Sequence, residues 1–210
     1  MTENSGSPVR FGLPALAAIL ALALGIYWFQ ADWRKATPSA PATPSTISRK
    51  LSTGAMSAFL VMPDRRPVGE FSFQDKKGVN LGLPAWRGRV VLVNLWATWC
   101  APCRREMTAL DRLQKKLGGP DFEVVAISVD RKGLEASAAF LTETGVQSLA
   151  LYVDPTSKAL AALKAPGLPL TVLLDRNGHE IGRLIGPAEW DSPEAENLIR
   201  AALAETAAGP

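Results

Sequence analysis

Cysteine and histidine are scarce in this sequence of 210 residues, which contains two cysteines and a single histidine, His179. A closed structural zinc site needs four ligands, and a disulfide-stapled scaffold needs several cysteine pairs, so both classes are excluded. The chain has no cluster of lysine and arginine interleaved with aromatic residues, and its net charge of +3 is small, which argues against nucleic-acid binding. The hydrophobic content of 47% excludes disorder throughout, and the length fits one globular domain with appendages.

Charge is absent from residues 11–31, a run of 21 residues that reads FGLPALAAILALALGIYWFQA. As a helix rising about 1.5 Å per residue, this run would span roughly 30 Å, the thickness of the hydrocarbon core of a bilayer. Tyr27, Trp28 and Phe29 stand at its far end, as interfacial anchors do. We therefore predict an uncleaved transmembrane anchor at 11–31, since a cleaved signal peptide has a shorter apolar region. Residues 1–10 are then the cytoplasmic N-terminus.

Proline, alanine, serine and threonine dominate residues 32–48, which favours an extended tether between the anchor and a folded domain. The domain itself is predicted at 49–206. Apolar residues recur at helical spacing from Leu51 to Met62, so its first element is predicted as a short amphipathic helix at 49–61.

Strands and helices alternate along the rest of the chain. Residues 90–96 (VVLVNLW) are continuously apolar apart from one asparagine, as expected of a strand buried on both faces. Asn177-Gly178 is a hairpin signal between strands predicted at 170–174 and 180–185. The remaining predicted elements are strands at 71–73, 122–129 and 149–153, and helices at 101–117, 134–144, 155–163 and 194–204, the last capped by Ser192. This order predicts an α/β fold with a mixed central sheet flanked by helices.

Both cysteines lie in the motif WCAPC at residues 99–103, between a predicted strand and a predicted helix. Cys100 would stand at the helix N-terminus, where unpaired N–H groups and the helix dipole favour a thiolate. Cys103 follows one turn later, and Pro102 fits the first turn, where a missing N–H costs nothing. A thiolate that attacks a disulfide and a second thiol that resolves the mixed disulfide are the requirements of thiol–disulfide exchange. A metal pair or a structural staple is the alternative, and a four-residue loop would stabilise little.

The segment WATWCAPCRREM at residues 96–107 resembles the thioredoxin superfamily, and specifically the membrane-anchored bacterial TlpA/ResA group. This resemblance implies a thioredoxin-like fold with an extra strand and helix inserted between residues 133 and 163. It implies that Cys100 is the exposed nucleophile and Cys103 the resolving thiol. The redox-active disulfide of these two residues would then be the reactive group, with no other cofactor and no metal.

The same resemblance assigns further residues to the site. Leu168-Pro169 matches a pair whose proline is cis in this superfamily and lies beside the disulfide, so Pro169 joins the catalytic residues. Trp99, Pro102 and Leu168 are expected to shape the groove that binds the partner protein.

Three positions depart from related sequences. Asn94 stands where thioredoxin has a buried aspartate, so another group must accept the proton of the resolving thiol, and Glu106 and Asp130 are candidates by position. Leu170 follows the expected cis-proline, where thioredoxins of cytochrome c maturation carry a glutamate. Thr108 replaces a helix-kinking proline found in many relatives, which predicts a straighter helix.

The function predicted from these features is reduction of protein disulfides by a membrane-anchored oxidoreductase. Arg10 on one flank of the anchor and Arg34 and Lys35 on the other do not fix its orientation. Disulfide chemistry fits the periplasm, which places the C-terminal domain there and makes the protein a single-pass inner-membrane protein. The resemblance implies copper-assembly substrates (a copper chaperone, or oxidase subunit II with its CuA centre), or else apocytochrome c, and a membrane thiol transporter as electron donor.

Two other functions compete with this one. A copper-binding chaperone would use Cys100, Cys103 and His179, since soft thiolates suit Cu(I). A peroxidase on the same fold would need a Thr-x-x-Cys site, which the sequence does not contain.

Overall fold

The computed structural model describes residues 43–44, 47 and 49–205. The anchor predicted at 11–31 lies outside these residues and stays a prediction, as do the domain boundaries. In the described part of the chain, no helix has the length and apolar character needed to cross a bilayer. Of the predicted linker, Thr43–Pro44 forms a short strand, β1, which pairs antiparallel with β3 (Asp64–Arg65).

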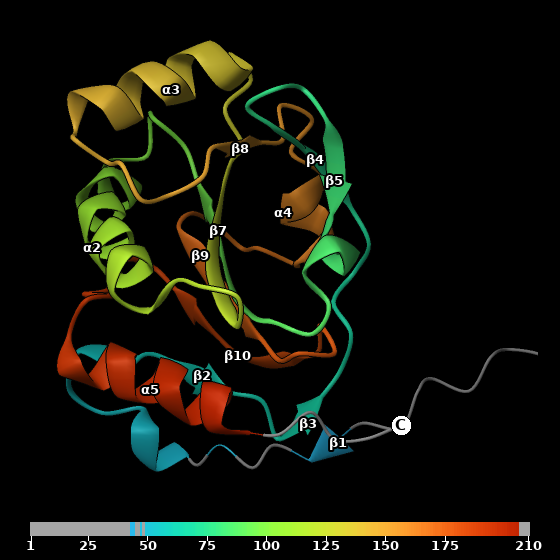
Figure 1. Ribbon diagram of the computed structural model, residues 1–210, viewed down its shortest axis with the longest axis vertical. Coiled ribbons are helices and arrows are strands. Elements are labelled where there is room, and N and C mark those ends of the chain that lie inside the picture. The colour runs from blue at the N-terminus through green and yellow to red at the C-terminus, as the bar shows by residue number, and fades with distance from the viewer. Residues whose placement is uncertain (1–42, 45–46, 48, 206–210) are drawn as a thin grey trace, which may run out of the picture. The chain divides into compact units, whose positions relative to one another are not determined.

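A mixed β-sheet forms the centre of the described domain (Figure 1). Within the described residues its strand order is β2-β10-β9-β6-β7-β8-β4-β5. The strands are β2 (Leu60–Val61), β4 (Ser72–Asp75), β5 (Asn80–Gly82), β6 (Val90–Trp96), β7 (Phe122–Ser128), β8 (Tyr152–Val153), β9 (Leu170–Leu174) and β10 (Glu180–Ile185). β6 runs parallel to β7 and antiparallel to β9, which confirms the mixed sheet predicted from the sequence.

The central strand β6 is buried along its whole length, as its apolar run predicted. Successive side chains of a strand point to opposite faces of the sheet. Leu92 and Trp96 accordingly join one core cluster, whereas Val91, Val93 and Leu95 join another. Because both faces of β6 are covered, the sheet has a core on each side.

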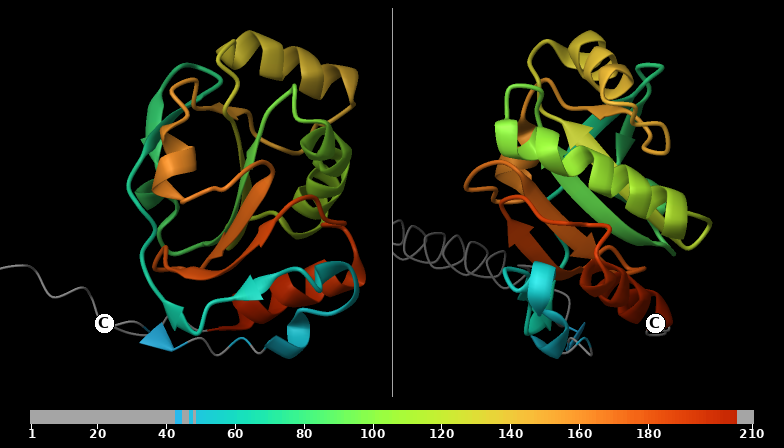
Figure 2. Two further views of the ribbon diagram at one scale, coloured as in Figure 1. Left: turned by 180° about the vertical axis from the view of Figure 1, so that it is seen from behind. Right: turned by 90° about the vertical axis from the view of Figure 1, so that its left-hand side faces the viewer.

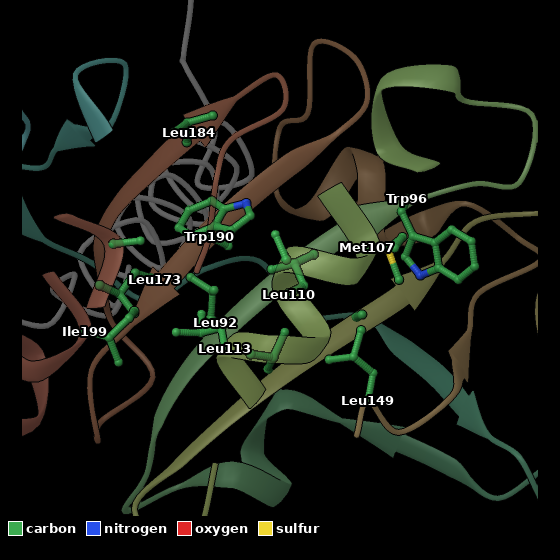
Figure 3. Packing of buried hydrophobic residues seen from close by; sticks show 14 of the residues in the cluster. Leu92, Trp96, Met107, Leu110, Leu113, Leu149, Leu173, Leu184, Trp190 and Ile199 are labelled. Atoms are coloured by element: carbon green, nitrogen blue, oxygen red, sulfur yellow. The ribbon is translucent and has the colours of Figure 1, made fainter. Parts of the chain in front are cut away.

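Helices cover the two faces. α2 (Ala101–Leu117), α3 (Gly133–Glu143) and α5 (Pro193–Ala204) contribute to the core that contains Leu92, and α2 crosses in front of the sheet in the right-hand view of Figure 2. α4 (Lys158–Ala162) packs on the opposite face. Figure 3 shows the larger cluster, where side chains of the sheet, of α2 and of the C-terminal region meet: Leu92, Leu110, Leu113, Leu173, Trp190 and Ile199.

The inserted segment is present: α3 has the length predicted for the helix at 134–144, but the two elements after it are shorter than predicted. The strand expected at 149–153 is only β8, and the helix expected at 155–163 is only α4. The helix begins late because the carboxylate of Asp154 accepts hydrogen bonds from the backbone N–H of Thr156 (3.1 Å) and of Ala159 (2.8 Å). These bonds hold a turn in place of the first helical residues, because Asp side chains compete with helical backbone bonds.

The amphipathic helix predicted at 49–61 is wrong. The segment forms two short 3-10 turns, η1 (Arg49–Leu51) and η2 (Gly54–Met56), followed by β2. Gly54 adopts φ +52°, a left-handed conformation that ends a right-handed helix. The apolar spacing reflects burial, since Met56 lies in the same core as α5.

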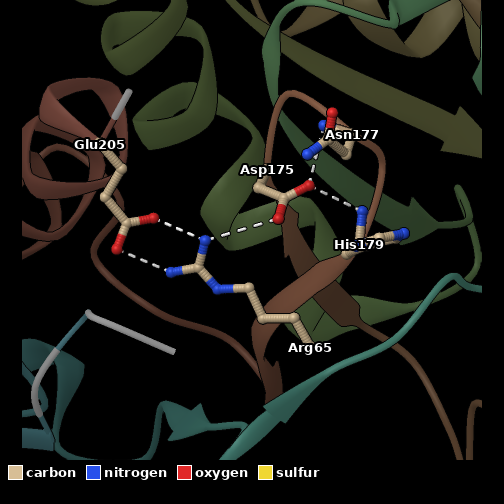
Figure 4. A network of polar contacts seen from close by, with 5 residues as sticks. All are labelled: Arg65, Asp175, Asn177, His179 and Glu205. Carbon is tan, nitrogen blue, oxygen red and sulfur yellow. Dashed lines mark hydrogen bonds and ion pairs between the residues drawn. The ribbon is translucent and has the colours of Figure 1, made fainter. Parts of the chain in front are cut away.

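A buried arginine joins three separate segments at one end of the domain (Figure 4). The guanidinium of Arg65 donates to Glu205 at 2.7 Å and to Asp175 at 3.4 Å. The other Asp175 oxygen accepts the backbone N–H groups of Asn177 and His179, both at 2.9 Å, within the hairpin turn between β9 and β10. One cation therefore links β3, this turn and the residue that follows α5.

We predict that Arg65→Met destabilises the domain by about 3 kcal/mol, because it removes a buried cation that bonds two partly buried carboxylates. Arg112→Met is the matched control, since Arg112 bonds Asp191 at 2.6 Å but its side chain is 58% exposed. Exposed pairs contribute at most about 1 kcal/mol. Denaturant unfolding of both variants measures the difference, and equal losses in the two would contradict the prediction.

Candidate active site

The two cysteines lie where β6 gives way to α2. Cys100 is the N-cap residue of α2, and Cys103 belongs to its first turn together with Pro102. The two sulfurs form a disulfide of 2.04 Å, with the Cα atoms 5.3 Å apart, and the Cys103 N–H points to the Cys100 Sγ at 3.3 Å. Cys100 retains 5% exposure and Cys103 none, so Cys100 is the sulfur-bearing residue nearer to solvent.

The Leu168–Pro169 peptide bond is cis, as the family resemblance implied. The register of β6 with β9 pairs Leu95 with Leu170. Leu168–Pro169 therefore precedes β9 at the end of the sheet where β6 leads into Cys100. Trp99 projects there with 69% of its surface exposed, which makes it the most exposed large hydrophobic side chain of the described residues.

A carboxyl group is buried next to this region. Glu106 lies one helical turn beyond Cys103, on the same side of α2, and is 2% exposed. Its oxygens accept from the Asn94 Nδ2 (2.8 Å), the Ala188 N–H (3.0 Å) and the Trp190 Nε1 (3.2 Å). Burial raises the pKa of Glu106 from 4.5 to about 7, while these three hydrogen bonds oppose the rise. The group can thus take up or release a proton near neutral pH.

Asp130, the other candidate proton acceptor, is hydrogen-bonded to Thr98. Its carboxylate accepts from the Thr98 N–H (2.6 Å) and from the Thr98 hydroxyl (3.1 Å), in the loop just before Trp99. Arg104 bonds the Thr98 carbonyl at 3.3 Å and stacks over the Phe140 ring at 4.8 Å. Both charged groups therefore fix the backbone of the loop that presents Trp99.

The structure does not bring His179 to the cysteines. His179 lies in the turn that follows β9, whereas Pro169 precedes that strand, so a five-residue strand of roughly 16 Å separates them. Within the described residues, no three His, Cys, Asp or Glu side chains group in a way that could hold a metal ion. A copper site built from the two cysteines and His179 is not formed.

Sequence reasoning missed most of the surroundings of Glu106. The spacing of Glu106 from Cys103 was visible, because three residues in a helix place two side chains on one face. Ala188 and Trp190 gave no such signal, since they come from a loop more than 80 residues further on. Only the packing of this loop against α2 reveals that they are donors to Glu106.

This arrangement defines a thioredoxin-like protein: a mixed sheet, a Cys-x-x-Cys disulfide at a helix N-terminus and a cis-proline at the same end of the sheet. The chain belongs to the Redoxin family, whose model matches residues 63–199.

Similar proteins agree with this assignment. The chain is 32% identical to the thiol-disulfide oxidoreductase ResA of Geobacillus kaustophilus, over 52% of this chain and 62% of that protein. It is 28% identical to ResA of Bacillus anthracis, over 55% and 66% respectively, so it spans just under two thirds of these relatives. Among solved structures, a candidate thiol:disulfide interchange protein DsbE from Chlorobium tepidum is 30% identical with a TM-score of 0.59, over 67% of this chain and 98% of that one.

The raised pKa of Glu106 predicts how stability depends on pH. Between about pH 4.5 and 7 the unfolded chain has lost the Glu106 proton while the folded chain keeps it, so stability falls as the pH rises through this window. A shift of this size corresponds to roughly 3 kcal/mol. Glu106→Gln removes the titration and should remove this component of the pH dependence. Unfolding curves of both proteins across the window test it, and parallel pH profiles would contradict it.

Proposed function

We propose that this protein is a thiol–disulfide oxidoreductase that reduces disulfides in other proteins through Cys100 and Cys103. The observation that carries the proposal is the Cys100–Cys103 disulfide at the N-terminus of α2, with Cys100 nearer to solvent and Cys103 fully buried. The relatives named thiol-disulfide oxidoreductase support the same activity.

The reaction follows from the unequal exposure of the two cysteine residues. In the reduced protein, the N-terminal N–H groups and dipole of α2 stabilise the Cys100 thiolate. This thiolate attacks one sulfur of the partner's disulfide, forms a mixed disulfide and releases the other sulfur as a thiolate, which takes a proton. Cys103 then loses its proton and attacks the Cys100 sulfur. The Cys100–Cys103 disulfide re-forms, the partner leaves with both cysteines reduced, and two electrons have moved to the partner.

Glu106 is the group that we assign to the proton of Cys103. It follows Cys103 by one turn of α2, and its pKa of about 7 suits a base that must work near neutrality. It also lines an open pocket of about 580 Å³, shared with Arg105 and Glu189, through which a proton can exchange with solvent. In this role Glu106 replaces the buried acid that thioredoxin carries at the position of Asn94.

Trp99, Pro102 and Leu168 are proposed to contact the partner, and Pro169 to line the site beside the disulfide. The support is their place around Cys100 at one end of the sheet. Trp99 offers the exposed apolar surface that protein interfaces favour.

The setting that we propose is the periplasmic face of a bacterial inner membrane, with residues 11–31 as the anchor and a membrane thiol transporter as electron donor. The uncharged apolar run supports the anchor. A compartment in which protein disulfides persist supports the location.

The proposed substrates are cysteines of copper-assembly proteins for the CuA centre of cytochrome oxidase, either the copper chaperone or oxidase subunit II. The resemblance to the TlpA/ResA group supports them. Apocytochrome c is the second candidate, and Leu170 in place of the glutamate typical of cytochrome c maturation weighs against it. The position of His179 disfavours a copper-binding chaperone.

Two cysteine variants test the roles of the sulfurs. Cys103→Ser should attack a protein disulfide at a nearly normal rate and then stop as a mixed disulfide, because no resolving thiol remains. Cys100→Ser is the matched control and should form no mixed disulfide. Non-reducing gels of the reduced variants mixed with a disulfide-bonded substrate measure both outcomes. Normal turnover by Cys103→Ser would show that the roles are assigned wrongly.

The mixed disulfide that Cys103→Ser retains can also be used as a trap that identifies the substrate. Full-length Cys103→Ser is expressed in the cells that make this protein, thiols are quenched with acid, and covalent partners are identified by mass spectrometry. A copper chaperone or oxidase subunit II among the partners is the expected result. Apocytochromes c in their place would overturn the copper-assembly proposal and leave the oxidoreductase activity standing.

A further inference from the structure

The side-chain amide of Asn94 is paired on one side only. Asn94 is fully buried in β6, and its Nδ2 donates both to Glu106 at 2.8 Å and to the hydroxyl of Thr171 at 2.9 Å. Its Oδ1 is also buried, yet no group in the described part of the chain donates a hydrogen bond to it. A buried carbonyl oxygen is normally paired, so the unpaired side of this amide calls for a physical reason.

The contacts of Glu106 belong to its ionised form. All three partners, on Asn94, Ala188 and Trp190, are N–H donors, and a carboxylate is an acceptor only. A protonated carboxyl group carries an O–H that must itself donate, and none of these three nitrogens can accept it. Among the atoms of these partner groups, the Asn94 Oδ1 is the free acceptor, and half a turn of the amide would bring it to Glu106.

We propose that the Asn94 amide reverses when Glu106 gains a proton, so that it donates to the Glu106 carboxylate at high pH and accepts from the Glu106 hydroxyl at low pH. Thr171 fits both states, because a hydroxyl group accepts a hydrogen bond as readily as it donates one. In the first state it accepts from Nδ2, and in the second it donates to Oδ1. After the reversal, Oδ1 accepts from both Glu106 and Thr171, and Nδ2 takes the position that the unpaired Oδ1 holds now.

The surroundings of Glu106 leave this amide as its adjustable partner. Ala188 contributes a backbone N–H, which cannot change from donor to acceptor, and Trp190 contributes an indole N–H with the same limit. The charged side chains that share its pocket are Arg105 and Glu189. From its own helix, the other titratable neighbour in the reduced protein is Cys103.

This inference rests on the proposed function for its consequence, since the proton in question is the one that Cys103 gives up. Asn94 is then a positioning residue: it keeps Glu106 hydrogen-bonded both before and after the proton arrives. The buried carboxyl therefore has the Asn94 amide as a hydrogen-bond partner in either protonation state.

Nuclear magnetic resonance of the oxidised full-length chain tests the reversal. We expect a nuclear Overhauser contact between the Asn94 amide protons and the Thr171 side chain at about pH 9 and its loss at about pH 5. The pH at which the contact is half lost should equal the midpoint of the Glu106 titration, which is followed by the chemical shift of its carboxyl carbon. Persistence of this contact on both sides of that midpoint would overturn the proposal.

Glu106→Gln is the matched control, because its amide has nearly the same shape and does not titrate. The Asn94 signals of this variant should not change over the same pH range, and a change that remained would show that another group drives it. Because the oxidised chain is titrated without a partner, the result does not depend on whether the protein reduces disulfides. If the Asn94 signals changed with pH as expected but Cys103→Ser captured no partner protein, the proposed function would be contradicted and the amide reversal would stand.

Discussion

The burial of β6 on both faces is the constraint on which the rest of the structure depends. A strand at the centre of a sheet must pair its backbone on both edges, and β6 does so with β7 and β9. Its side chains supply two cores, which hold α2 on one face and α4 on the other. Because β6 ends at Trp96, four positions before Cys100, the core in which β6 is buried also fixes where the disulfide stands.

The sequence predicts the strands of this core well, but it does not predict which groups surround the Glu106 carboxyl. Residues 90–96, 170–174 and 180–185 were predicted with the bounds that the structure has, because apolar runs and a hairpin turn are local signals. The helix predicted at 49–61 is wrong, because Gly54 takes a left-handed conformation that interrupts a right-handed helix. The apolar residues of this segment are buried in the core without forming a helix, so their spacing alone was misleading. The donors to Glu106 could not be found, since they depend on how distant segments pack.

Burial and hydrogen bonding act on Glu106 in opposite directions, and burial prevails. An isolated ionised carboxylate in a core is costly, so burial alone disfavours the charge. Three donors from β6 and from the loop before α5 recover part of that cost. The result is a carboxyl that changes charge near neutrality, within one helical turn of Cys103. A carboxyl that titrates near neutrality is thus present, although the side chain of Asn94 does not titrate.

The Arg65 cluster and the disulfide lie at opposite ends of β9. β3 and the turn around His179 meet where β9 ends, and the backbone of Arg66 accepts from the Glu180 N–H at 2.9 Å in the same region. Cys100 and Pro169 stand at the other end. The Arg65 cluster therefore lies at one end of the described domain, and the Cys100–Cys103 disulfide lies at the other. The residues that hold β3 to the domain are thus different from those that surround the disulfide.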